Sequence, residues 1–221
     1  MAKTPISYHV PSASVVHVAN VIERWLRSNP RIFRNEMELQ LYLALHMNTD
    51  PAFLGLGYEV CLEYHVPASV TTKSNMEVDI VLHHKATDKY ILLELKYKTV
   101  SKGSPLYYPF GGTVAVPLLS DHLAKGRYRC QYWDDVQRIE SLKSRMSPKI
   151  EGGIALFLTN DMAYQNPPTS RSGWAAYTMH DGAIVGHGTS HPASPIRGIY
   201  KVAGQHITTG TIPFYYCMTL I

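Results

Sequence analysis

The chain has 221 residues, of which 45% are hydrophobic, and this is enough for one well-buried core. Its 21 basic and 17 acidic residues leave a net charge of +4, a mild excess that favours polyanionic partners without requiring them. Three distant cysteines exclude a disulfide framework or a CxxC zinc site, and no apolar run is long enough to cross a bilayer. We therefore expect a single domain over residues 1–221, cytoplasmic and without a membrane segment.

The first half of the chain predicts two helices and three strands. One helix is capped by Ser12 or Ser14, and a second begins at Asn35 and ends near Met47. Residues 58–66 alternate between apolar and polar side chains, which indicates a half-buried strand. Two more strands, residues 76–84 and 89–98, flank a four-residue turn. Together the three strands predict an antiparallel meander.

The second half begins with a long connection, residues 99–126, that has no clear periodicity. Such a long loop inside a compact domain is usually functional. A helix over residues 127–146 and a buried strand over 154–158 follow. Short apolar runs at 174–177, 183–185, 199–202 and 214–220 indicate a β-rich extension over about 161–221. The predicted fold is α/β (α+β), with a core of helix, three-stranded antiparallel meander, helix and strand over about 35–160.

The hairpin register brings three charged side chains together. Counting outward from a His84–Lys89 pair places Asp79 directly opposite Glu94, and Lys96 shares the face of Glu94. Two facing carboxylates repel each other unless a cation neutralises them, and oxygen ligands of this kind suit Mg²⁺. A neighbouring lysine can position water and meet the charge that builds on a phosphate. The pattern predicts metal-assisted phosphodiester hydrolysis.

The alternative is a surface cross-strand ion cluster without catalytic function. Residues 90–97 are apolar enough to form a central strand of the sheet, where unpaired charge is expensive. This position favours the functional interpretation.

These residues resemble the PD-(D/E)XK superfamily, the restriction-endonuclease-like nucleases. Asp79 matches the family's first Asp, and residues 94–96 match the (D/E)XK element on the next strand. The order of elements over about 35–160 also matches the family core. Val78 stands where the family has a proline. The resemblance implies a metal-dependent endonuclease acting on DNA.

In this family resemblance, Mg²⁺ is the expected metal and Mn²⁺ a substitute. Asp79, Glu94 and the backbone carbonyl of Leu95 would hold the ion. Lys96 would orient the attacking water or help to deprotonate it.

The resemblance also implies an acidic residue from the preceding helix, and Glu36 and Glu38 compete for this role. Glu38 already has a structural task, because it stands at the far end of a capping box that begins at Asn35. Glu36, with Gln40 one turn later, better resembles the Asn-Glu-x-x-Leu-Gln pattern of some relatives. We favour Glu36, as a metal ligand directly or through water.

Substrate contacts are expected from cations and aromatic rings in and around the long loop. The candidates there are Lys98, Lys102 and Tyr107, and on the flanking helices Gln40, Gln131 and Arg138. For Asp135 and Arg138 we favour a surface helical ion pair over a catalytic role, because they stand three residues apart.

Duplex DNA is the favoured partner, and a homodimer would suit cleavage of both strands. One alternative is a catalytically inactive protein of the same fold that binds nucleic acid or a partner. The presence of all three core residues argues against it. Another is a nuclease acting on RNA or structured DNA, which would share the site and differ only in groove shape.

Overall fold

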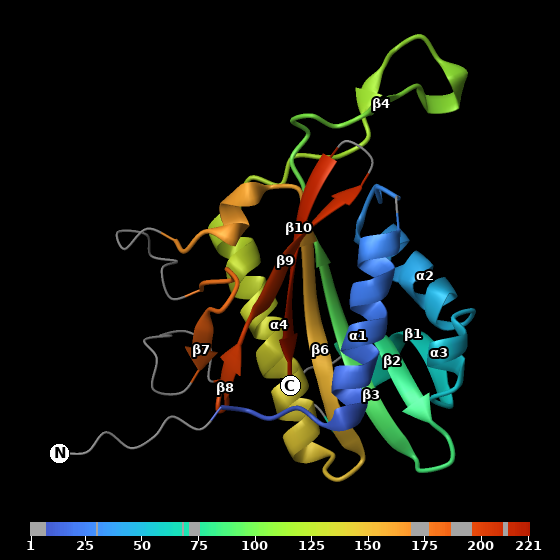
Figure 1. The fold of residues 1–221 in the computed structure, drawn as a ribbon, viewed down its shortest axis with the longest axis vertical. Coiled ribbons are helices and arrows are strands. Elements are labelled where there is room, and N and C mark those ends of the chain that lie inside the picture. Colours follow the sequence, from blue (N-terminus) through green and yellow to red (C-terminus); the bar gives the residue numbers. More distant parts are fainter. Residues whose placement is uncertain are drawn as a thin grey trace, which may run out of the picture.

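The computed structural model describes residues 8–29, 31–67, 69–70, 76–168, 177–186, 196–209 and 212–221. A six-stranded sheet runs through the centre in the order β1-β2-β3-β6-β10-β9 (Figure 1). The strands are β1 (Tyr58–Val66), β2 (Met76–His84), β3 (Lys89–Tyr97), β6 (Ile150–Thr159), β9 (Ala203–Thr209) and β10 (Ile212–Leu220). Neighbours pair antiparallel except β3 and β6, which are parallel. The mixed α/β prediction and the antiparallel meander are confirmed.

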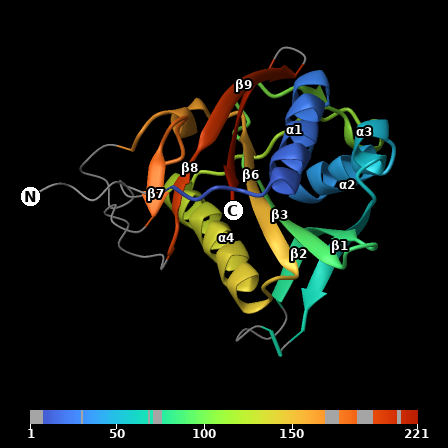
Figure 2. The same cartoon turned by 60° about the horizontal axis from the view of Figure 1, so that its bottom comes forward.

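Helices cover both faces of the sheet (Figure 2). They are α1 (Ala13–Ser28), α2 (Glu36–Met47), the short α3 (Pro51–Leu54) and α4 (Lys125–Arg145). On one face, α1 and α2 pack on a core that includes Ile80, Leu93 and Leu95. On the other, α4 packs on a second core that includes Leu92 and Phe157. Because side chains alternate along a strand, Glu94 and Lys96 share the α4 face with Leu92.

The helix starts follow from the caps that the sequence predicts. Ser12 accepts a hydrogen bond from the backbone N–H of Val15 at 3.3 Å, so Ser12 rather than Ser14 caps α1. Asn35 accepts from the backbone N–H of Glu38 at 2.8 Å. The Glu38 carboxylate does not return to Asn35 as a capping box would require, because it accepts from the backbone N–H of Arg34 at 2.6 Å.

The end of the chain differs from the predicted extension. Strands β9 and β10 add to the central sheet, with β10 paired along β6, so these residues help to build the main core. The strands β7 (Ile184–Gly186) and β8 (Ile199–Lys201) form a separate pair. The run at 174–177 lies outside the described residues except for Tyr177. Short runs predicted local strands, but only long-range pairing decided which sheet each one joined.

The long connection between β3 and α4 carries a small hairpin of β4 (Leu106–Tyr107) and β5 (Val116–Pro117). Two 3-10 turns, η1 (Pro109–Gly111) and η2 (Met162–Gln165), complete the regular elements. Within the described ranges, no helix combines the length and apolar character needed to cross a bilayer.

Candidate active site

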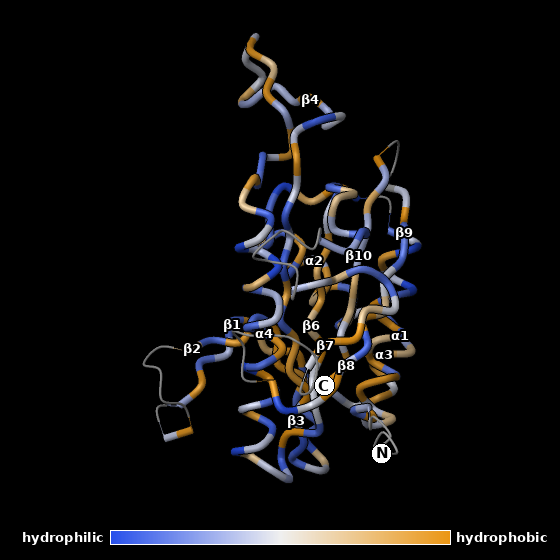
Figure 3. The backbone as a smooth tube through the Cα atoms, turned by 90° about the vertical axis from the view of Figure 1, so that its left-hand side faces the viewer, coloured by the Kyte–Doolittle hydropathy of each residue, from blue (hydrophilic) through white to orange (hydrophobic). Residues whose placement is uncertain are grey.

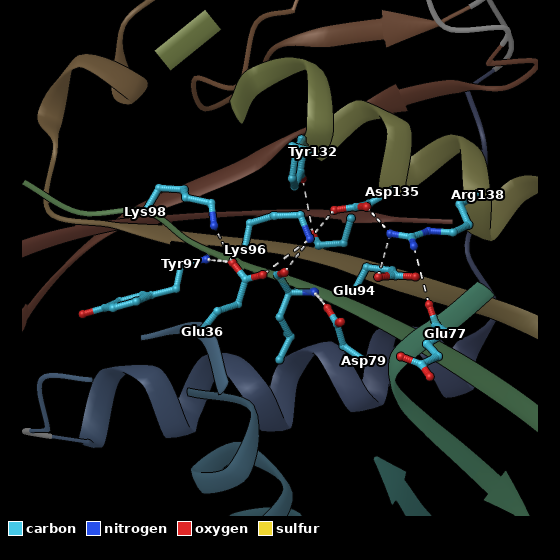
Figure 4. A network of polar contacts seen from close by, with 12 residues as sticks. Glu36, Glu77, Asp79, Glu94, Lys96, Tyr97, Lys98, Tyr132, Asp135 and Arg138 are labelled. Carbon is cyan, nitrogen blue, oxygen red and sulfur yellow. Dashed lines mark hydrogen bonds and ion pairs between the residues drawn. The ribbon is translucent and has the colours of Figure 1, made fainter. Parts of the chain in front are cut away.

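A cluster of charged side chains lies where β2, β3, α2 and α4 meet (Figure 4). Its carboxylates are Glu36, Asp79, Glu94 and Asp135, and its cations are Lys96, Lys98 and Arg138. With every group ionised, four negative charges face three positive ones. The cluster is partly open to solvent, since the side chain of Glu36 is 33% exposed and that of Arg138 27% exposed.

Asp79 stands where β2 separates from β3. The predicted register is confirmed from His84–Lys89 as far as Ile80–Leu93, and the ladder ends there. The extrapolated register predicted that Asp79 pairs directly with Glu94, and this prediction was wrong. Its Oδ2 instead accepts a hydrogen bond from the backbone N–H of Leu95 at 2.6 Å, so the side chain still reaches β3.

Gln40 of α2 holds the same point of β2. Its Nε2 donates to the backbone carbonyl of Asp79 at 2.5 Å, and Asp79 has no partner residue in the register of either neighbouring strand. Gln40 is only 6% exposed, so we assign it to supporting Asp79 rather than to contacting substrate.

Glu94 is the most deeply buried acid of the cluster, with 1% of its side chain exposed. Its Oε2 lies 3.0 Å from Nη2 of Arg138, whereas its Oε1 has no hydrogen-bond partner. Burial raises the pKa of Glu94 well above its usual value, although the Arg138 guanidinium opposes this rise. The nearby carboxylates of Asp135 and Asp79 raise it further.

The Asp135–Arg138 ion pair forms on α4, but the expectation that it lies on the surface was wrong. Asp135 is 4% exposed, and its carboxylate contacts Arg138 and lies 3.1 Å from Nζ of Lys96. Tyr132 and Val136 pack against the sheet and bring Asp135 with them. The signal was present in the sequence, because Asp135 falls within the apolar stripe of its helix.

Lys96 is surrounded by oxygen atoms. Its Nζ lies 3.7 Å from Oε1 of Glu36 and donates to the backbone carbonyl of Leu95 at 3.0 Å. Burial alone would lower the pKa of Lys96, but the surrounding carboxylates, that of Asp135 first, raise it above its usual value. Lys96 therefore carries a proton at neutral pH.

Glu36, rather than Glu38, reaches this cluster from α2. Oε2 of Glu36 accepts from the backbone N–H of Tyr97 at 2.7 Å and lies 3.0 Å from Nζ of Lys98. Glu38 points elsewhere and pairs with Arg34. Of the two candidate acids of α2, Glu36 is therefore the one that joins the cluster.

The remaining predicted substrate contacts divide between the cluster and its surroundings. Lys98 lies in the cluster through Glu36. Gln131 is half-buried on α4, one turn before Asp135. Lys102 and Tyr107 are exposed on the connection between β3 and α4, outside the cluster.

Among the residues that the structure describes, no group of three or more His, Cys, Asp or Glu side chains is arranged as a metal site. The carboxylates of the cluster contact protein cations and N–H groups instead.

The burial of Glu94 generates a prediction about stability. Since its pKa is higher in the folded chain than the ordinary 4.5, the stabilising contribution of Glu94 is full below that pH and is lost as the pH rises through the folded pKa. Glu94→Gln removes the buried charge, while Arg138 keeps its ion pair with Asp135. We therefore expect this variant to raise the free energy of unfolding at pH 8 by about 1–2 kcal/mol, or roughly 2–8 °C in Tm.

The measurement is thermal unfolding in EDTA at several pH values between acid and pH 8. Glu77→Gln is the matched control, because Glu77 lies on β2 with an exposed side chain. The Tm gap between Glu94→Gln and the unmodified chain should widen with pH. A Glu94→Gln variant less stable at pH 8 would contradict this account.

Comparison with known proteins yields no relative. No protein-family model, curated protein or solved structure matches this chain.

Proposed function

We propose that this chain is a Mg²⁺-dependent endonuclease that hydrolyses phosphodiester bonds in DNA. The observation that supports this most is Glu94, a carboxylate buried in the centre of the sheet with one oxygen unpartnered. It lies beside Asp79 and Lys96, whose charges act on it. Such an arrangement destabilises the fold, and acids of this kind cluster at functional sites.

The donor atoms present fit Mg²⁺. This ion usually takes one or two protein carboxylates and keeps water or phosphate oxygens as its other ligands. Glu94 Oε1 needs a partner, and the Leu95 carbonyl and the Asp79 carboxylate flank the same part of β3. Asp79, Glu94 and the Leu95 carbonyl would hold the ion, with Glu36 assisting directly or through water. Mn²⁺ suits the same oxygen ligands.

A bound Mg²⁺ would supply Lewis acidity and a water of lowered pKa. The protonated state of Lys96 argues against the role of general base for that residue. A protonated ammonium cannot remove a proton, but it can orient water and stabilise negative charge on a phosphate. We therefore assign Lys96 to positioning and charge stabilisation in preference to general-base catalysis.

Glu36 and Asp135 hold Lys96 between them. They lie on opposite sides of its ammonium, at 3.7 and 3.1 Å, and come from α2 and α4. Two fixed carboxylates restrict the rotamers of a long side chain. Lys96 is thereby held ready near the reacting phosphate, which is what efficient catalysis requires.

Cleavage of supercoiled plasmid tests the class of reaction. We expect nicking with Mg²⁺, none with EDTA, and none with Asp79→Ala, because that change removes one of the two acids on adjacent strands. Glu77→Ala is the matched control on the same strand and should cut normally. Nicking that persists in EDTA or with Asp79→Ala would refute the proposed site.

Lys96→Ala tests the role of the lysine. Removing one group that stabilises charge in the transition state lowers kcat by about 10²–10³-fold, so we expect at least this loss in a folded variant. Lys85→Ala is the control, since Lys85 pairs on the surface with Glu59. Normal cleavage by folded Lys96→Ala would remove the lysine from the mechanism.

One observation favours a second candidate, a nucleic-acid-binding protein without catalysis. The Arg138 guanidinium already occupies one oxygen of Glu94, so the protein supplies a cation of its own there. In an inactive protein this pair would be a permanent structural feature, and binding would not depend on Mg²⁺.

Arg138→Met separates the two candidates. Removing one partner of a buried ion pair costs about 3–5 kcal/mol, and we expect the lower end because Arg138 is partly exposed. If Glu94 binds the metal, adding Mg²⁺ should restore part of the Tm that Arg138→Met loses. The same buffer with EDTA in place of Mg²⁺ should not. If Mg²⁺ changes the Tm of neither Arg138→Met nor the unmodified chain, the inactive candidate is favoured.

A further inference from the structure

The connection between β3 and α4 projects away from the sheet as an arm. We define the aromatic arm as residues 104–118, which contain the β4–β5 hairpin and η1. It extends past the end of the sheet (Figure 1), and apolar segments lie along it (Figure 3). Among residues 102–120 the only charged side chain is that of Lys102.

Large apolar side chains of the arm point into solvent. The side chain of Phe110 is fully exposed, and that of Tyr108 is 58% exposed. Leu106 and Val114 are also exposed, so the arm does not fold these groups into a core of its own. Several large apolar side chains exposed on one short segment are typical of a binding site.

The backbone at the tip is strained in a way that favours this exposure. Phe110 has a φ of 53°, the left-handed region that bulky residues rarely adopt, and Gly111 follows with a φ of 70°. Glycine would fit the first position without strain. A phenylalanine held there and exposed gains nothing from packing, which points to a role in binding.

The root of the arm is tied to the strands of the candidate site. Asn160, which follows β6, exchanges two hydrogen bonds of 2.8 Å with the backbone of Val100. Asp121 accepts from the backbone N–H of Ser101 at 2.6 Å and from its hydroxyl at 2.9 Å. The root of the arm at Val100 thus lies two residues after Lys98 of the cluster, and these hydrogen bonds hold it against the end of β6.

We propose that the aromatic arm binds unpaired nucleobases of a nucleic acid by stacking them on Tyr108 and Phe110. This inference rests on the proposed function, because it places the bases beyond the backbone that the cluster would cleave. Aromatic faces stack on any base, and the tip has neither the cations that phosphates require nor carboxylates that would repel them.

A second copy of the chain fits the arm less well. Each strand of the hairpin has two residues, and prolines at 105, 109 and 117 remove N–H groups that an added strand would need. Nucleobases need only ring faces, which the arm offers.

The test is fluorescence anisotropy in EDTA, where cleavage cannot interfere. The probes are a labelled oligothymidylate and an abasic strand of the same length, which has the phosphates but lacks the bases. We expect the oligothymidylate to bind more tightly. Phe110→Ala should weaken this binding by about 5–150-fold, the effect of losing one stacked base, and should leave abasic binding unchanged.

Leu123→Ala is the matched control, because Leu123 is exposed in the same connection but outside the arm. Unchanged binding by Phe110→Ala, an equal loss on the abasic strand, or equally strong competition by blunt duplex would overturn the proposal. The proposal would also be overturned if sedimentation showed that the chain is a dimer, and if Phe110→Ala made it a monomer without changing oligothymidylate binding. Base-dependent binding without plasmid nicking would refute the proposed nuclease function and leave the proposed base binding by the aromatic arm in place.

Discussion

The candidate site depends on one interaction, the contact between the buried Glu94 carboxylate and the Arg138 guanidinium. Glu94 belongs to a central strand with neighbours on both sides, so water does not solvate it. A charge in such a place is tolerated only when a partner compensates it. Arg138 supplies that compensation from α4, and it does so incompletely, because one Glu94 oxygen is left unpartnered.

This contact joins the packing of α4 to the chemistry of β3. The apolar stripe of α4 sets how closely the helix approaches the sheet; Asp135 lies within that stripe and Arg138 follows one turn later. Asp135 then fixes Lys96 from one side while Glu36 of α2 approaches from the other. Elements on both faces of the sheet therefore hold a single lysine, which is the kind of support that preorganised sites need.

Contacts within the cluster hold Asp79 at the point where β2 stops pairing with β3. A regular ladder would use the backbone groups of Asp79 for the sheet. Here the carbonyl accepts from Gln40 and the carboxylate accepts from Leu95, so the strand diverges without leaving these groups unsatisfied. The divergence turns Asp79 from a cross-strand neighbour of Glu94 into a separate acid near the same strand. Extending a regular register from the turn could not show this, because the partners come from α2 and β3.

From the sequence we could predict the helix cap at Asn35, the hairpin register near its turn, and the common face of Glu94 and Lys96, whereas Ser12 and Ser14 remained alternatives for the first cap. These features depend on contacts between residues close in the chain, which periodicity and turn length specify. The tertiary structure decided the contacts of Asp135 with Lys96 and of Arg138 with Glu94, the meeting of Glu36 with Lys96, and the entry of β9 and β10 into the sheet. Those outcomes require helices and strands from distant parts of the chain to pack together, and local patterns do not encode the approach of one element to another.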